Sequence, residues 1–197
     1  MTLAMGAYFF FIAFILAHLE IQIEGPHGWA EKLPTWRWDS PRVRRWFGKP
    51  VTGYHLCLLT LILLFLHVPQ LYGAYWEREA DLLAMFFLLT VTWDFLWFAC
   101  NRHFGVARFR KGQVWWFPTW TLGVPREYFV GVAFSLCAAL APALWTGAWA
   151  DRARRWALIF GELLALTTAV TALTLRSRRQ TAALFRGIRD AVRVKPK

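Results

Sequence analysis

The sequence predicts an all-α integral membrane protein with five transmembrane helices. Of its 197 residues, 57% are hydrophobic and only 18% are charged, whereas about a quarter of a typical soluble domain is charged. The apolar residues form long blocks, and the Lys and Arg residues that give a net charge of +11 flank those blocks. This composition excludes a disordered tail, a disulfide scaffold and an ordinary cytosolic enzyme. It also argues against nucleic-acid binding, because the basic residues form no stripe on a polar fold.

A helix needs about 20 apolar residues to cross a bilayer core. Five stretches meet this requirement, and together they define one predicted transmembrane domain over residues 1–175: 3–22, 51–72, 82–100, 128–149 and 156–175. The first stretch lacks both a basic n-region and a small-residue cleavage site, which predicts a retained helix. The fourth stretch is the weakest because it contains Gly131 and Pro142, although membranes tolerate both in helices.

The distribution of Lys and Arg predicts the orientation. Connections 23–50 and 101–127, together with the tail from residue 176, hold 19 of the 23 Lys and Arg residues. Connections 73–81 and 150–155 hold the other four. Basic residues favour the cytoplasmic side. We therefore expect the plasma (inner) membrane as location, with the N-terminus outside and the C-terminus in the cytoplasm.

Both long connections on the basic side combine Trp with Arg. Segment 23–50 contains four prolines and cannot be one continuous helix. Indole rings favour the headgroup level, and guanidinium groups favour anionic phosphates. The two segments are thus expected to lie along the membrane interface, either as simple anchors or as a lid over a binding site. Four polar residues are candidates for binding a headgroup or phosphate: Arg37, Asn101, Arg108 and Arg110.

The tail, residues 176–197, places apolar residues at helical spacing between arginines. This pattern predicts a basic amphipathic helix that rests on the inner leaflet, with partner docking as the alternative. The three cysteines lie in or beside apolar blocks without a C-x-x-C motif, which indicates small apolar fillers.

Ionisable residues in a bilayer are costly and often functional. By helical rise, five of them lie near the cytoplasmic ends of their helices and are the candidate catalytic residues: His18, Glu20, Glu24, His55 and Asp94. Glu20 and Glu24 stand four residues apart and share a helix face. His67 and Glu162 lie at similar heights near the outer face, where they could form an isolated pair.

The inner cluster suits several kinds of chemistry. A divalent metal, with Zn, Fe or Mn the best matches, could be bound by His18, His55, Glu24 and Asp94. General acid–base catalysis on an amphipathic substrate, proton transfer and purely structural hydrogen bonding between helices remain open. Haem is less favoured, because His18 and His55 are the only candidate pair of axial ligands on that side.

Sequence motifs do not identify a reaction. The run Glu24-Gly25-Pro26-His27 has the Glu-x-x-His form of di-iron bundles, but it occurs once and contains Gly-Pro. No H-E-x-x-H, G-x-S-x-G, P-loop or dinucleotide fingerprint is present. Whether the protein is an enzyme therefore stays open at this stage.

Three functions are compatible with these observations. The leading hypothesis is a membrane protein whose polar His/Glu/Asp site binds or modifies a lipid-like or isoprenoid substrate, with or without a metal. The first alternative is a non-catalytic subunit that scaffolds a redox or photosynthetic complex. The second is a small transporter or proton pathway that uses Asp94, His67 and Glu162. Expected partners are anionic lipids and either other membrane proteins or further copies of the chain.

Overall fold

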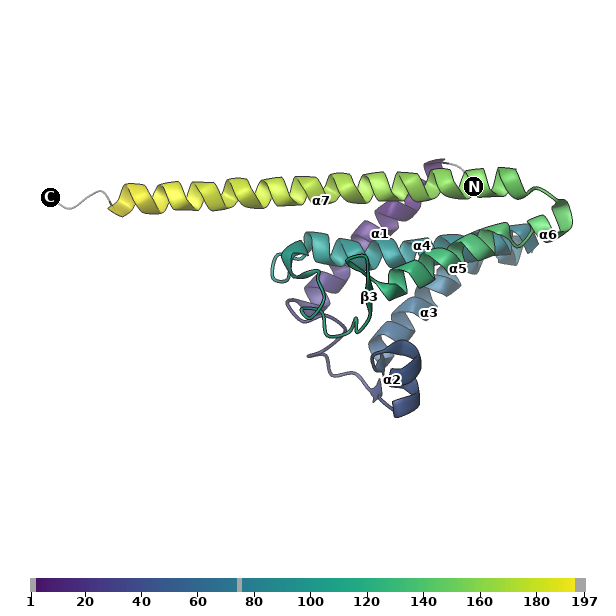
Figure 1. The fold of residues 1–197 in the computed structure, drawn as a ribbon, viewed down its shortest axis with the longest axis horizontal. Helices are drawn as coiled ribbons and strands as arrows, with labels where there is room; N and C mark the ends of the chain where they lie inside the picture. The colour runs from purple at the N-terminus through teal and green to yellow at the C-terminus, as the bar shows by residue number, and fades with distance from the viewer. Residues whose placement is uncertain (1–2, 74–75, 194–197) are drawn as a thin grey trace.

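The computed structural model describes residues 3–73 and 76–193, without the side chains of 76–77, 184–185 and 187–193. The fold is all-α with two minimal β-ladders (Figure 1). The elements in chain order are α1 (Leu3–Glu24), β1 (Arg37–Trp38), α2 (Pro41–Phe47), β2 (Val51–Thr52), α3 (Gly53–His67), the 3₁₀ helix η1 (Val68–Tyr72), α4 (Trp76–Cys100), the 3₁₀ helix η2 (Val106–Arg108), β3 (Trp120–Thr121), β4 (Val124–Pro125), α5 (Arg126–Leu140), α6 (Ala143–Thr146) and α7 (Trp149–Arg193).

Within the described residues, five helical segments are long and apolar enough to cross a membrane, as predicted. Helix α4 lies at the centre of the bundle and packs against α1, α3, α5 and α7. In the most apolar window of α4, 61% of the residues are buried, whereas the corresponding value for α3 is 11%. Side chains on α4 are therefore the most shielded from lipid, and α3 is largely left to face the bilayer.

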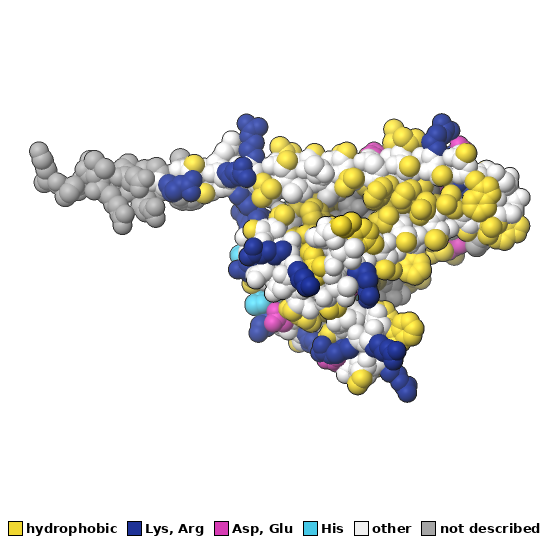
Figure 2. Space-filling view, in the orientation of Figure 1, with side chains coloured by type: hydrophobic (Ala, Val, Ile, Leu, Met, Phe, Trp, Pro, Cys, Tyr) yellow, Lys and Arg dark blue, Asp and Glu magenta, His cyan; other side chains and the backbone are white. Residues whose placement is uncertain are grey.

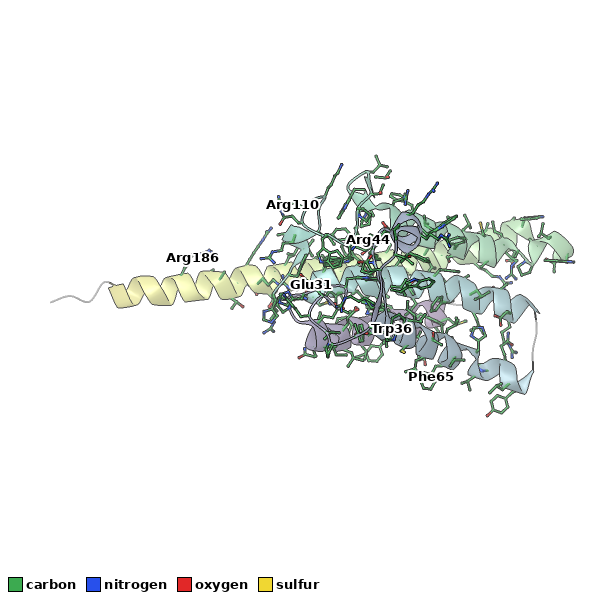
Figure 3. The ribbon with its side chains drawn as sticks, turned by 90° about the horizontal axis from the view of Figure 1, so that it is seen from below. Glu31, Trp36, Arg44, Phe65, Arg110 and Arg186 are labelled. Atoms are coloured by element: carbon green, nitrogen blue, oxygen red, sulfur yellow. The ribbon has the colours of Figure 1, made fainter. Side chains whose placement is uncertain are left out.

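The surface is apolar where a soluble protein would be polar. Figure 2 shows hydrophobic side chains spread over α5 and the neighbouring part of α7, with Lys and Arg gathered around the lower loops and where α7 leaves the bundle. Large side chains such as Phe65, Leu64 and Phe134 are more than half exposed. Phe65 points away from the other helices in Figure 3. Such a surface is stable only against hydrocarbon.

The helix boundaries differ from the sequence prediction in three places. Helix α4 begins at Trp76 instead of residue 82, because the helix continues through charged residues that lower the local hydropathy. The fourth span is broken: α5 ends at Leu140 and α6 begins at Ala143, with Pro142 between them, since proline cannot donate the backbone hydrogen bond a continuous helix needs. The fifth span begins at Trp149 and not at residue 156.

The C-terminal tail is helical, as predicted, but it is not a separate helix. Helix α7 continues without a break to Arg193 and extends well beyond the bundle in the direction of the last span (Figure 1). Residues that favour helices and the absence of proline between residues 149 and 195 explain this continuity. That the tail rests on the inner leaflet stays a prediction. The apolar residues on which it depended, Leu184, Phe185, Ile188 and Val192, have side chains outside the described residues.

The two long connections fold together at one end of the bundle, and we call residues 25–52 and 101–125 the cap. In the first segment β1 pairs with β2 in antiparallel register, Arg37 opposite Thr52, and Ser40 caps the short helix α2. In the second, β3 pairs with β4 around a tight turn. The ends of α1 and α4 and the starts of α3 and α5 all adjoin the cap.

An aromatic cluster fixes the cap to the helices. The ring of Trp116 stacks on Phe98 at a centroid distance of 6.0 Å and meets Trp97 edge-on at the same distance. Asn101, which is fully buried, donates from Nδ2 to the carbonyl of Gly25 at 2.7 Å and so joins the end of α4 to the end of α1. These contacts hold the cap over the polar ends of α1 and α3.

Candidate functional site: a buried Glu–Glu–His cluster

Glu20 and Glu24 point into the protein because of the pattern of small residues on α1. Ala13 and Ala17 are fully buried, and Glu20 and Glu24 continue the same face at spacings of three and four residues. Small residues let helix backbones approach closely in membranes, so this face lies against α4. The two carboxylates are thereby placed inside the bundle, with exposed fractions of only 8% and 6%.

His55 faces them from the first turn of α3. Thr52 is the N-cap of that helix and accepts a hydrogen bond from the backbone N–H of His55 at 3.3 Å. The Thr52 hydroxyl also lies 2.7 Å from Nδ1 of His55. This contact occupies Nδ1, and it directs Nε2 of the ring at the two carboxylates.

The three side chains converge to distances that suit metal ligation. Nε2 of His55 lies 3.3 Å from Oε1 of Glu20 and 3.6 Å from Oε1 of Glu24, and one ligand atom from each residue lies within 4.8 Å of the others. Ligand atoms bound about 2.1 Å from a tetrahedral ion lie about 3.4 Å apart. The two distances from His55 are therefore close to those of a tetrahedral site, and the third pair of atoms lies within 4.8 Å.

Asp94 lies on α4 beside this cluster. Its Oδ2 accepts a hydrogen bond from the hydroxyl of Tyr128, in the first turn of α5. Both Asp94 and the cluster residues line one pocket of about 130 Å³. This position makes Asp94 available as a fourth ligand, the third that is an oxygen, or as a proton acceptor beside the cluster.

Tryptophans form much of the remaining wall of this pocket. Trp29 of the cap stacks on the His55 ring at a centroid distance of 4.0 Å, and Trp116 closes the same side. Trp93 and Trp97 of α4 are each 3% exposed, and within the described residues neither indole N–H has a hydrogen bond of normal geometry. A buried donor without an acceptor is uncommon, and both indoles line the same pocket as the carboxylates.

The loop beneath Trp29 is strained, and it serves the site directly. Trp29 and Ala30 have φ values of 57° and 52°, in a region that costs non-glycine residues free energy and often marks functional sites. The N–H of Ala30 donates to Oε1 of Glu24 at 2.5 Å. The guanidinium of Arg37 in turn binds the carbonyl oxygens of Ala30, Glu31 and Thr35.

Lys49 is the buried cation nearest the site. Its ammonium lies 3.5 Å from the centroid of the Trp29 ring and 4.5 Å from that of Phe117, and the residue is 9% exposed. Burial lowers the pKa of Lys49 to about 8, against the opposing influence of Asp94, Glu127, Glu20 and Glu24. These four carboxyl groups outnumber the single ammonium of Lys49. Buried negative charge in such excess requires protons or a further cation.

The structure brings together Glu20, Glu24, His55 and Asp94, but it separates His18 from them. His18 packs edge-on against Phe14 on another face of α1 and lines a different hollow, with Cys100 and Arg178. His18 thus lies outside the cluster and cannot be one of its metal ligands or catalytic residues. Its neighbour Ala17 occupies the face that meets α4.

Three of the four residues predicted to bind a headgroup contact other parts of the protein instead. Arg37 binds carbonyls of its own loop, as described above. Asn101 uses Nδ2 on Gly25 and Oδ1 on the N–H groups of His103 and Phe104, so its amide is fully engaged. Arg108 lies over the Phe104 ring at 5.4 Å, and Arg110 lies exposed on the cap (Figure 3).

The suggested outer pair of His67 and Glu162 does not form. Nε2 of His67 lies 2.8 Å from Oε1 of Glu79, at the start of α4. The carboxylate of Glu162 instead lies against Gly6 of α1, where a side chain on that glycine would collide with it. Glu79 is the closer partner because the short connection between α3 and α4 brings these helix ends together.

Sequence reasoning missed four residues of the site: Lys49, Thr52, Tyr128 as the donor to Asp94, and the ring of Trp29 over His55. A Thr three residues before a His at a helix start is a recognisable N-cap pattern. The other three depend on how the cap folds back, which no local pattern encodes. Comparisons with protein-family models, with curated proteins and with solved structures find no match to this chain.

Proposed function

We propose that this protein binds a divalent transition metal in its membrane-embedded pocket, and that the metal acts on the polar end of a lipid-like or isoprenoid substrate. The observation that carries the proposal is the convergence of Glu20, Glu24 and His55 within 4.8 Å of one another in a buried pocket. Two carboxylates and one imidazole suit Zn²⁺, Fe²⁺ or Mn²⁺. Three protein ligands leave a coordination position open, as in catalytic metal sites.

The surroundings favour a catalytic metal site over a purely structural one. A metal in this position could polarise a substrate oxygen or activate a water molecule. Asp94 lines the same pocket and could accept a proton. Structural sites, by contrast, normally fill all four positions with protein ligands.

The size of the pocket and the exposure of α3 favour a substrate from the bilayer. About 130 Å³ accommodates a small polar group but not a whole lipid. Gly53, His55 and Ile62 are the buried residues of α3, so this wall of the pocket is otherwise bordered by lipid. An amphipathic molecule could insert its polar end while its chain stays in hydrocarbon.

Metal titration of the purified protein in detergent tests the binding step. We expect Mn²⁺, followed by electron paramagnetic resonance, to bind one site per chain, and Glu24→Gln and His55→Gln to weaken binding by about 100-fold or more. Glu31→Gln and His103→Gln are matched controls on exposed residues of the cap. Equal affinity in all five proteins would overturn the assignment of the ligands.

The substrate step needs a separate measurement. Protein reconstituted in vesicles of total bacterial lipid, and loaded with Zn²⁺, Fe²⁺ or Mn²⁺, is incubated before the lipids are extracted for mass spectrometry. We expect a lipid or isoprenoid species to change with the wild-type protein and to stay unchanged with Glu24→Gln. Unchanged extracts from a fully metal-loaded wild-type protein would contradict catalysis but leave metal binding standing.

A further inference from the structure

A second hollow lies at the cap end of the bundle, between α1, the end of α4 and α7. Its volume is about 400 Å³, and none of the residues that line it lines the Glu20–Glu24–His55 pocket. His18, Arg102, Ser177 and Arg178 supply polar groups, and Phe14 and Leu173 are among its apolar lining residues. The hollow is thus amphipathic in its own right.

Positive charge is available inside this hollow. Arg178 uses one amino group to donate to the carbonyl of Asn101 at 2.8 Å, while its Nε is buried without a partner among the described residues. Arg102 is exposed, and its side chain makes no hydrogen bond or ion pair within the described part of the chain. Among the described residues, no carboxylate lines the hollow to neutralise the two guanidinium groups. Two guanidinium groups that line one hollow without a carboxylate beside them favour an anionic ligand.

The lining also limits what the anion can be. Phe14 on α1 and Val170 and Leu173 on α7 lie nearer the middle of their spans than the polar residues do. Hydrocarbon therefore borders the hollow on one side and guanidinium groups border it on the other. A phosphate attached to an acyl chain satisfies both sides, whereas a free phosphate satisfies only one.

We infer that this hollow binds the phosphate of an anionic phospholipid, held by Arg102 and Arg178 with His18 and Ser177 beside it. The acyl chain of the lipid would lie along Phe14 and Leu173. The site is independent of the proposed metal centre, and it gives His18 a role different from the one predicted from the sequence.

Native mass spectrometry of the full chain tests this inference. The protein is exchanged into detergent that contains equal amounts of phosphatidylglycerol and phosphatidylcholine. We expect one retained phosphatidylglycerol, preferred about tenfold over phosphatidylcholine, and near-equal retention after Arg102→Gln or the double change with Arg178→Gln. Arg179→Gln, one residue further on α7 and exposed, should keep the preference.

Three outcomes would overturn the inference. They are equal retention of both lipids by the wild-type protein, an unchanged preference in the double variant, and displacement of phosphatidylglycerol by excess inorganic phosphate, which would indicate a soluble ligand. Arg178 also binds the end of α4, so its loss could perturb folding. Arg102→Gln removes only an exposed side chain that has no other partner among the described residues, and the test therefore stands on this variant alone if the double variant unfolds.

Discussion

The hydroxyl of Thr52 lies 2.7 Å from Nδ1 of His55, one helical turn further along the chain. The same oxygen accepts the backbone N–H of His55 and thereby caps α3. One side chain thus both starts the helix and orients the imidazole toward Glu20 and Glu24. Outer-shell partners of this kind commonly fix the ring of a metal-binding histidine.

Replacing Thr52 should therefore weaken metal binding without removing a ligand. We expect Thr52→Val to lower the affinity for Mn²⁺ about 10- to 100-fold, because the ring loses its hydrogen bond at Nδ1. Thr52→Ser keeps the hydroxyl and should bind as the wild type does. Titration against a competing chelator measures the effect, and a Val variant with unchanged affinity would show that the contact does not support the site.

Gly28 is expected to be essential for closing the cap over the pocket. A Cβ at this position would collide with the indole ring of Trp116, which is itself 3% exposed and cannot move freely. We expect Gly28→Ala to lower the free energy of unfolding by about 1–3 kcal/mol, the usual cost of overpacking. Gly161→Ala on α7, where a Cβ would meet no atom within 4 Å, should be neutral or slightly stabilising. Thermal unfolding in detergent distinguishes the two, and equal melting temperatures would contradict the proposed packing.

The buried ammonium of Lys49 should make stability depend on alkaline pH. Burial lowers its pKa from 10.5 to about 8, so between these values the unfolded chain holds a proton that the folded chain has lost. The contribution of Lys49 to the free energy of unfolding therefore rises as the pH increases from about 8 to 10.5. We expect the melting temperature of the wild type to rise relative to that of Lys49→Met across this pH range. Lys111→Met, which changes an exposed residue, should follow the wild type. Parallel curves for the wild type and Lys49→Met would argue against a buried, charged Lys49.

The hydrogen bond from Tyr128 to Asp94 should stabilise the fold. Tyr128→Phe leaves a shielded carboxylate without its donor, and we expect a loss of about 1–3 kcal/mol in the free energy of unfolding. Tyr72→Phe, at a residue that is 89% exposed, is the matched control. Denaturation of both variants provides the measurement, and an unperturbed Tyr128→Phe would indicate that Asp94 obtains its stabilisation elsewhere.

The spans and half of the site were predictable because local patterns encode them. Hydropathy defines the membrane helices, and the four-residue spacing of Glu20 and Glu24 places both on one face. Helical rise from the cap end correctly put His55 and Asp94 at similar depth. Depth alone, however, does not give the direction of a side chain around the helix axis. For this reason the sequence does not separate His18 from the Glu20–Glu24–His55 cluster.

The rest of the site depends on tertiary contacts of the cap. Lys49 lies behind the pocket wall only because the segment that follows α2 folds back over Trp29 and Phe117. The position of Trp29 depends on its backbone φ of 57° and on the hydrogen bond from its indole to the carbonyl of Pro50 at 2.8 Å. These features join residues 20 or more positions apart, and the spacing rules for helices do not extend that far.

Elemental analysis of the protein, purified from membranes without added metal or chelator, tests the metal centre most directly. The account predicts one equivalent of zinc, iron or manganese per chain, with the same metal lost from Glu24→Gln and His55→Gln and retained by Glu31→Gln. A wild-type protein that remains free of these metals after dialysis against each of them would contradict it, as would metal content that is indifferent to the loss of Glu24 and His55.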